Sequence, residues 1–332
     1  MNVLDLLRRG KPAQPLELSV SELDLPGDLE TPVSAFLKLR EIGARFLLES
    51  AEEPTSIGRY TFIGIRPLLR IRIEPDHTLI AGESGKLELE HESPATPFTG
   101  LRRILKSFKI SAGGSEIPLL GGLVGFASYE INQCFEPQLA GRLRESNWPL
   151  GLYYFVDTLL VFDHFTRRMK LLRLNVAGDP LTAGGEPLSE SEVRAALLRE
   201  VVAPTIDRQA VHNGYKSNFA QNEFEQAVVK VQEYIHKGDT FQTVISQREQ
   251  HESAVDPFQV YRSLRMLNPS PYMYFLDFDD LQLIGSSPEA LVKLKDRQAI
   301  VRPIAGTRRR GRDAEDERRM ATELLHDEKE RA

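Results

Sequence analysis

The chain has 332 residues, of which 41% are hydrophobic and 27% are charged, as in ordinary folded proteins. That apolar content excludes a chain that is disordered throughout. The formal net charge of −6 argues against nucleic acid or an anionic membrane as the main partner. The single cysteine, Cys134, excludes a disulfide framework and a cysteine metal cluster. Residues 1–10 lack the apolar core of a signal peptide, and we expect a cytoplasmic protein that does not enter a membrane.

Helix and strand signals alternate through the first half of the chain. Thr31 is a suitable N-cap for a helix that Gly43 ends. Ser189 and Glu192 form a capping-box pattern at the start of another helix. Alternation of apolar and polar residues predicts several strands, and the last of these strand regions turns as a hairpin near residues 163–168. The predicted strand regions cover residues 45–50, 59–64, 68–73, 117–130 and 151–174.

The second half begins after a predicted domain boundary near residues 203–214. Its clearest helix covers residues 224–237 and is followed by Gly238, which suits a helix end. Residues 240–248 then carry a strand pattern. On such a strand, the polar side chains from Gln242 to Arg248 would share one face and line something polar.

Three short segments each allow an ordinary structural interpretation and a functional one. Residues 268–272 contain two prolines and form either a rigid loop before a strand or part of a site. Glu289, which follows a proline after an apolar strand, is either a positioned acid or a residue that faces a helix dipole. Gly306 and Thr307 form either a tight turn or a backbone that lets an anion approach.

Acidic residues recur near the end of the chain. Residues 313–332 carry a helix pattern, on which Glu323, Asp327 and Glu330 would fall in one arc. Such an arc is either an exposed, salt-bridged face or a site for Mg²⁺, which prefers carboxylates and water. Taken together, the residues alone support an anion or dicarboxylate site with Mg²⁺.

Eight blocks follow one another in a fixed order: LLES (47–50), GRYTFIG (58–64), GGLVGFASYE (121–130), DTLLVFDH (157–164), YIHKGDTFQTVISQR (234–248), NPSPYMYF (268–275), GSSPE (285–289) and RPIAGTRRRG (302–311). In this order they resemble anthranilate synthase component I, a member of the wider family of chorismate-utilising enzymes. The resemblance implies an α+β fold with mostly antiparallel β-sheets flanked by helices and an incomplete core. It also implies an N-terminal domain over residues 1–205 with feedback-site elements, and the first part of a chorismate-binding domain over residues 206–332.

Two positions distinguish among members of this wider family. Gln242 stands where isochorismate and salicylate synthases have a lysine that activates water, which favours ammonia as the nucleophile here. Ala305 stands where lysine-type aminodeoxychorismate synthases have a nucleophilic lysine, so the substitution should be direct. The resemblance therefore implies an anthranilate synthase, a lyase of tryptophan biosynthesis. Aminodeoxychorismate synthase component I, of the folate pathway, is the alternative enzyme.

The resemblance also implies roles for individual residues. Chorismate would bind through its carboxylates to Mg²⁺ and to backbone N–H groups, with Gly306 and Thr307 in contact and Glu330 as a metal ligand. Ammonia would add at ring C2 near Gln242 while Glu289 protonates the leaving C4 hydroxyl. For that role, burial should raise the pKa of Glu289. Loss of pyruvate would then give anthranilate.

A glutamine amidotransferase subunit, anthranilate synthase component II, would supply the ammonia. Tryptophan would be the feedback ligand, and a tryptophan-binding regulatory remnant without catalysis is the non-enzyme alternative. Because the later catalytic and metal residues of the family lie beyond residue 332, we expect the chain itself to be inactive. The predicted feedback residues are Glu49, Ser50, Pro271, Tyr272 and Met273.

Overall fold

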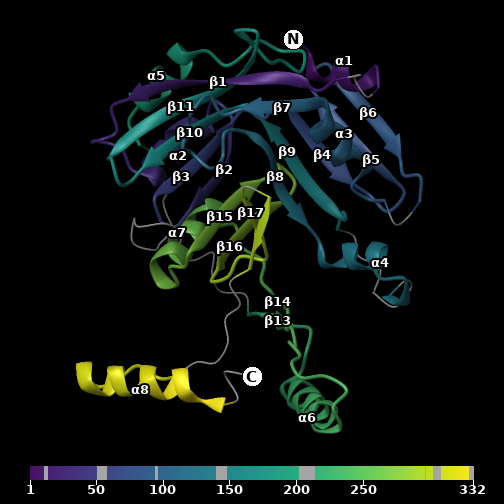
Figure 1. Cartoon of the computed structure of the whole chain (residues 1–332), viewed down its shortest axis with the longest axis vertical. Coiled ribbons are helices and arrows are strands. Elements are labelled where there is room, and N and C mark those ends of the chain that lie inside the picture. The colour runs from purple at the N-terminus through teal and green to yellow at the C-terminus, as the bar shows by residue number, and fades with distance from the viewer. Residues whose placement is uncertain are drawn as a thin grey trace. The chain divides into compact units, whose positions relative to one another are not determined.

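Figure 1 shows a computed structural model of the chain. The structure describes residues 1–10, 14–50, 58–93, 96–139, 148–201, 214–295, 297–301 and 308–328. It contains two compact units, one formed by Met1–Val201 together with Tyr261–Ala332, and the other by Val202–Val260. The predicted boundary near 203–214 falls almost entirely outside the described residues, so the domain division stays a prediction.

A nine-stranded sheet forms the larger part of the first unit. Among its described strands, β1 and β7 pair in parallel and all other neighbours pair antiparallel. Strands β15 and β16 belong to this sheet although they come from the chain after the predicted boundary. The order is β16 (Gln282–Ser287), β15 (Tyr272–Asp277), β2 (Ala44–Glu49), β3 (Tyr60–Ile65), β10 (Thr158–Asp163), β11 (Arg168–Val176), β1 (Leu16–Leu25) and β7 (Phe108–Ser111), with β12 (Asp179–Pro180) beside β11.

The first unit also contains a second sheet, of five antiparallel strands. Asp157 lies between β9 and β10, so the chain passes from one sheet to the other at this residue. The predicted hairpin is confirmed, because β10 pairs with β11 around a turn at residues 164–167. The sheet order is β6 (Gly85–Glu90), β5 (His77–Gly82), β4 (Leu69–Ile73), β9 (Gly151–Val156) and β8 (Gly122–Ala127).

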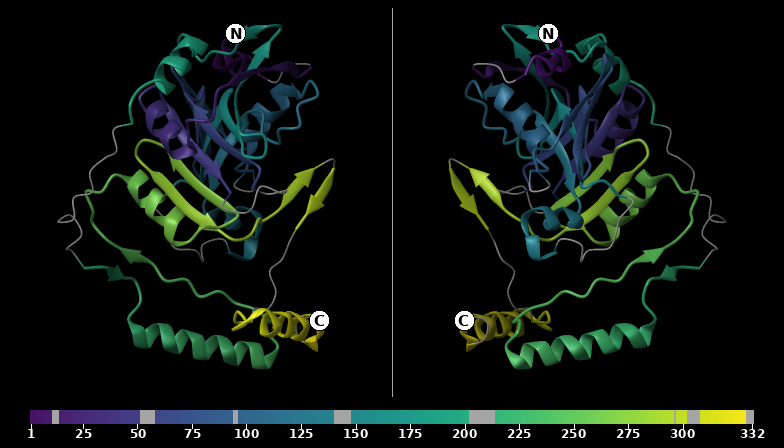
Figure 2. Two further views of the ribbon diagram at one scale, coloured as in Figure 1. Left: turned by 90° about the vertical axis from the view of Figure 1, so that its left-hand side faces the viewer. Right: turned by 90° about the vertical axis from the view of Figure 1, so that its right-hand side faces the viewer.

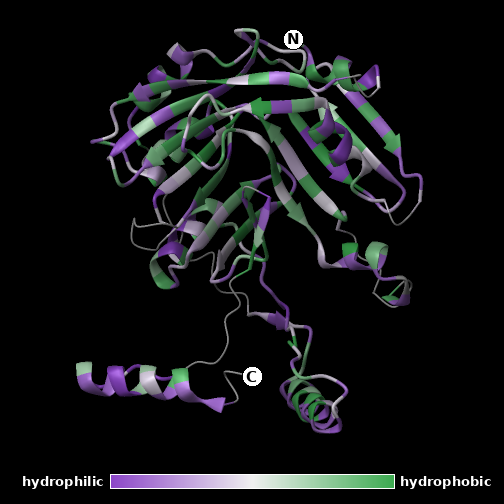
Figure 3. Ribbon diagram, viewed as in Figure 1, coloured by the Kyte–Doolittle hydropathy of each residue, from purple (hydrophilic) through white to green (hydrophobic). Residues whose placement is uncertain are grey.

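Strand β9 is buried on both faces. Tyr154 belongs to one apolar cluster with Phe46 and Phe278, whereas Phe155 belongs to another with Ile71 and Leu174. Figure 3 shows hydrophobic residues concentrated on the strands of both sheets. This packing confirms the predicted class, a mixed α+β fold with mostly antiparallel sheets.

Capped helices pack against the sheets. The helices α2 and α7 lie on the same face of the nine-stranded sheet, where Phe36 of α2 and Tyr261 of α7 both contact Phe275 of β15 edge-on (Figure 2). Both predicted caps are confirmed: Thr31 accepts from the Ser34 backbone N–H at 3.1 Å, and Ser189 accepts from that of Glu192 at 3.2 Å. The helices of this unit are α1 (Val3–Arg8), α2 (Pro32–Arg40), α3 (Thr99–Ser107), α4 (Asn132–Phe135), α5 (Glu190–Leu197), α8 (Ala314–His326) and, from Tyr261 onward, α7 (Pro257–Leu267). The unit also contains the 3₁₀ turns η1 (Tyr129–Ile131) and η2 (Pro137–Leu139) and the strand pair β17 (Lys293–Lys295) and β18 (Gln298–Ile300).

The second unit contains α6 (Gln221–Lys237), which ends at Gly238 with a φ of 79° as predicted. The predicted strand over residues 240–248 is wrong. These residues form no ladder, and only β14 (Glu249–Gln250) pairs with β13 (Lys216–Ser217). An extended segment becomes a strand only when a neighbouring backbone accepts and donates a series of its hydrogen bonds, and among the described residues only the backbone N–H of Asn218 donates to this segment, at the Arg248 carbonyl.

Candidate functional site

Two segments far apart in the sequence meet where β2 pairs with β15. The register places Met273 opposite Glu49 and Tyr274 opposite Leu48. Residue 50 follows the end of β2, and residue 271 precedes the start of β15, so both chain segments border the same edge of this strand pair. The antiparallel pairing therefore brings residues 47–50 and 271–273 side by side.

A cavity of about 300 Å³ opens at this place. All five predicted feedback residues line it, which is the grouping that the sequence resemblance implied. Most of its wall is apolar or aromatic, and Met273 at its edge is almost fully buried. Its lining comprises Leu48, Glu49, Ser50, Tyr60, Phe62, Leu119, Pro271, Tyr272, Met273 and Tyr274.

Glu49 supplies the negative charge of this cavity. Its side chain is only 4% exposed, and Arg265 of α7 donates a hydrogen bond from Nε to its Oε1. Burial, and then the nearby charge of Glu49, raise the pKa of Tyr261, whose ring is fully buried beside the pair. A buried carboxylate next to an aromatic cavity suits a small ligand with an ammonium group and an apolar body.

The predicted acid, Glu289, lies just after β16, where the Ser287 hydroxyl donates to its backbone carbonyl at 3.1 Å. Its side chain is exposed, so the expected burial is not found. Gln242 belongs to the other compact unit and is also exposed. Glu289 and Gln242 therefore belong to different compact units, and their predicted roles stay predictions.

The helix predicted over residues 313–332 is shorter than expected, and because Glu330 lies outside the described residues the metal role of the acidic arc stays a prediction. The helix α8 ends at His326, and Asp327 already has extended backbone angles. Glu323 is paired with Arg319 at 2.6 Å and Asp327 with Arg308 at 2.6 Å, so both carboxylates serve ion pairs. Among the described residues, no group of three or more His, Cys, Asp or Glu side chains is placed to hold a metal ion.

Gly306, Thr307, Ala305 and Glu330 lie outside the described residues. Their predicted contacts with chorismate and Mg²⁺ stay predictions. Sequence reasoning also missed Arg265 and Tyr261, which complete the surroundings of Glu49. Arg265 is separated from Glu49 by 216 positions, and no local pattern signals a contact over that distance.

A family model described as chorismate binding enzyme matches residues 43–332. The chain belongs to this chorismate-binding enzyme family. Anthranilate synthase component 1 of Aquifex aeolicus (strain VF5) is 38% identical over 322 residues, which cover 92% of the chain and 62% of that protein. Anthranilate synthase component 1 of Geobacillus stearothermophilus is 34% identical over 320 residues, again covering 92% of the chain and 62% of that protein.

A solved structure shows the same fold within the family. The crystal structure of anthranilate synthase component I from Streptococcus pneumoniae TIGR4 matches with a TM-score of 0.59 and 28% identity. The match covers 94% of this chain and 65% of that chain. This member of the chorismate-binding enzyme family thus spans less than two thirds of the length of these relatives. Among the described residues, no helix combines the length and apolar character needed to cross a membrane.

Proposed function

We propose that this chain is part of an anthranilate synthase component I, a lyase that converts chorismate and ammonia to anthranilate and pyruvate in tryptophan biosynthesis. The names of the relatives at 38% and 34% identity support the proposal. Gln242 and Ala305 support it too, because neither offers the lysine that the water-using or covalent relatives employ. The name component 1 of these relatives also fits a second component, a glutamine amidotransferase that delivers ammonia. The cytoplasmic location stays a prediction.

The proposed catalytic roles follow the sequence motifs. Gln242 borders the attacking ammonia, Glu289 protonates the leaving hydroxyl, and Gly306 and Thr307 contact chorismate. Because Glu289 is exposed in the described structure, its role as an acid requires substrate or further protein to exclude water around it. Mg²⁺, with Glu330 as a ligand, would neutralise the carboxylates of chorismate.

We further propose that the cavity between β2 and β15 binds tryptophan as a feedback inhibitor. The observation that carries this proposal is the convergence of all five predicted feedback residues on one cavity. The apolar wall suits an indole ring, and the buried carboxylate of Glu49 suits the ammonium group. Since this cavity lies wholly within the first compact unit, we expect the chain to bind tryptophan without catalysing the reaction.

Calorimetric titration of the 332-residue chain with L-tryptophan tests the regulatory proposal. We expect one site per chain, at least tenfold weaker binding in Glu49→Gln, and loss of binding in Ser50→Phe, which fills the cavity. The control Glu323→Gln, which removes an exposed carboxylate elsewhere, should leave the affinity unchanged. Binding by Ser50→Phe as tight as that of the parent would rule out this cavity as the tryptophan site.

Product identification tests the catalytic proposal on the full-length protein. With chorismate, ammonium and Mg²⁺, chromatography should detect anthranilate and pyruvate, whereas aminodeoxychorismate would support the folate enzyme instead. We expect Glu289→Gln to lower kcat at least a hundredfold. Glutamine should replace ammonium only when the amidotransferase subunit is added.

A further inference from the structure

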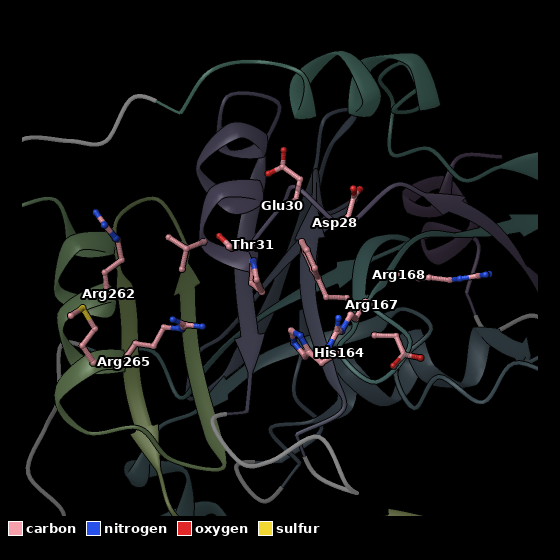
Figure 4. A pocket seen from close by; sticks show the side chains of 14 residues that line it. Asp28, Glu30, Thr31, His164, Arg167, Arg168, Arg262 and Arg265 are labelled. Atoms are coloured by element: carbon pink, nitrogen blue, oxygen red, sulfur yellow. The ribbon is translucent and has the colours of Figure 1, made fainter.

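A larger cavity of about 560 Å³ lies on the first unit, where no predicted site residue is found. Three elements surround it: the approach to α2 and its first turn, the turn between β10 and β11, and the last turns of α7 (Figure 4). Its size is that of a pocket for a small organic ligand. The lining residues are Gly27, Asp28, Glu30, Thr31, Pro32, Val33, Phe162, Asp163, His164, Arg167, Arg168, Arg262, Arg265 and Met266.

Arginines dominate the charge of this cavity. Figure 4 shows Arg265 extending from α7 toward its middle, and Arg167 lying beside His164 below Thr31. Neither Arg167 nor Arg168 has an ion-pair partner among the described residues. By contrast, two of the lining carboxylates are already neutralised, since Glu30 pairs with Lys38 and Asp163 pairs with Arg59 at 2.9 Å.

Asp28 is the lining carboxylate that lacks an ion-pair partner in the described part of the chain, and it is exposed. It offsets at most one of the two charges of Arg167 and Arg168, whereas Arg265 is already paired with Glu49. Burial lowers the pKa of His164, so its ring is neutral near pH 7 and the arginines carry the positive charge. The cavity therefore attracts a ligand with negative charge.

The backbone at Arg167 determines where its side chain lies. Its φ of 56° lies in the left-handed region, which glycine and asparagine adopt far more readily than arginine. An arginine at this turn position places its side chain beside the cavity, although its backbone adopts this φ at a higher conformational free energy than a glycine would.

Apolar groups form the remaining wall. Pro32 and Val33 of α2, the ring of Phe162 and the side chain of Met266 border the arginines, and Met266 is 82% exposed. The backbone N–H of Val33, in the first turn of α2, has no acceptor among the described residues. We propose that this cavity binds an organic anion, with an aromatic or aliphatic body on the apolar wall and a carboxylate or phosphate held by Arg167 and Arg265.

The cavity shares Arg265 with the carboxylate of the neighbouring pocket. An anion beside Arg265 reduces the positive field that an ammonium group meets at Glu49, so an anion and tryptophan should bind with positive cooperativity, each tightening the other equally. This coupling rests on the proposed tryptophan site, whereas binding of the anion does not.

Methyl NMR of the methionines tests the proposal on the full chain, because the sequence has only five methionines and one of them, Met266, lines this cavity. The probes are phenyl phosphate, benzoate and the neutral analogue benzyl alcohol, at constant ionic strength. We expect a saturable shift of the Met266 methyl with an anionic probe, no shift of the Met273 methyl, and at least tenfold weaker binding of benzyl alcohol. A response to phenyl phosphate alone identifies a phosphate site, and a response to both anions identifies a broader one.

The key variant is Arg167→Gly, which relieves the strained φ and removes the cation. It should bind the anionic probe at least tenfold more weakly without a lower melting temperature. Arg297→Gly is the matched control, because Arg297 is exposed and has a similar φ of 63° but does not line the cavity. An unmoved Met266 methyl, equal binding of benzyl alcohol, or undiminished binding by Arg167→Gly would each overturn the proposal.

Repeating the titration with saturating L-tryptophan examines the coupling separately. A tighter anion affinity supports it, and an unchanged or weaker affinity with tryptophan bound contradicts it. If tryptophan itself does not bind, the tryptophan proposal fails while the Met266 response still decides the anion site.

Discussion

The segments around β2 and β15 and those around residues 240–248 carry sequence motifs of similar strength, yet they differ sharply in the structure. In the first region Phe46 and Phe275 are fully buried, and the two strands pair with each other. In the second, α6 has no buried residue and Phe241 is 93% exposed. The difference teaches that a family motif specifies the identity of a segment, whereas a neighbouring element decides whether that segment folds as the pattern predicts.

The test with the largest expected effect on the free energy of unfolding removes one aromatic ring from each region. Phe275→Ala should lower the free energy of unfolding by about 3–5 kcal/mol, because it leaves a cavity between Phe36 and Tyr261. Phe241→Ala should change it by less than about 0.5 kcal/mol. Urea unfolding monitored by circular dichroism measures both, and equal losses would show that residues 240–248 are packed after all.

The junction between the two sheets of the first unit should depend on pH. Burial raises the pKa of Asp157 to about 7. Between about pH 4 and pH 7 the folded chain therefore keeps a proton that the unfolded chain has lost, so the unfolding free energy falls as the pH rises through this window. The expected fall is up to about 4 kcal/mol. In Asp157→Asn this contribution should vanish; an identical pH profile in the variant would show that the carboxyl is ionised when folded.

Ion pairs offer a third comparison. Arg265→Met leaves the buried carboxylate of Glu49 without its partner and should cost about 3 kcal/mol. Arg194→Met removes the exposed pair with Glu190 on α5 and should cost less than about 1 kcal/mol. A double variant, Glu49→Gln with Arg265→Met, should recover much of the first loss. Thermal unfolding of the four proteins distinguishes these cases, and a harmless Arg265→Met would mean that water already solvates Glu49.

The smallest expected effect concerns a helix cap. Ser189→Ala removes the hydroxyl that accepts from the backbone N–H of Glu192 and should lower the unfolding free energy by about 1 kcal/mol. Ser189→Asn, which retains a capping acceptor, is the matched control and should remain close to the parent. If both substitutions cost the same, the cap contributes nothing and α5 is held by packing alone.

Local patterns predicted the caps of α2 and α5, the regions of β2, β3, β4, β8 and β9 to β11, and the β10–β11 hairpin, because each depends on neighbouring residues. The sequence analysis did not predict β1, β5, β6 or β7. The grouping of Glu49 with Met273 was predicted from the family resemblance. The strand at 240–248 failed because the described chain gives it no ladder partner, and the helix predicted over residues 313–332 was too long because α8 ends at His326. No local signal marked Arg265, whose partner lies in another element.

The central claim is that the residues around β2 and β15 form one cavity that binds tryptophan. The methyl resonance of Met273 tests it most directly, since Met169 and Met320 lie outside this cavity and serve as internal controls. Adding L-tryptophan should move the Met273 resonance through the ring current of the indole, saturate at one ligand per chain, and leave the controls unmoved. A Met273 resonance that stays in place at saturating tryptophan would contradict the account.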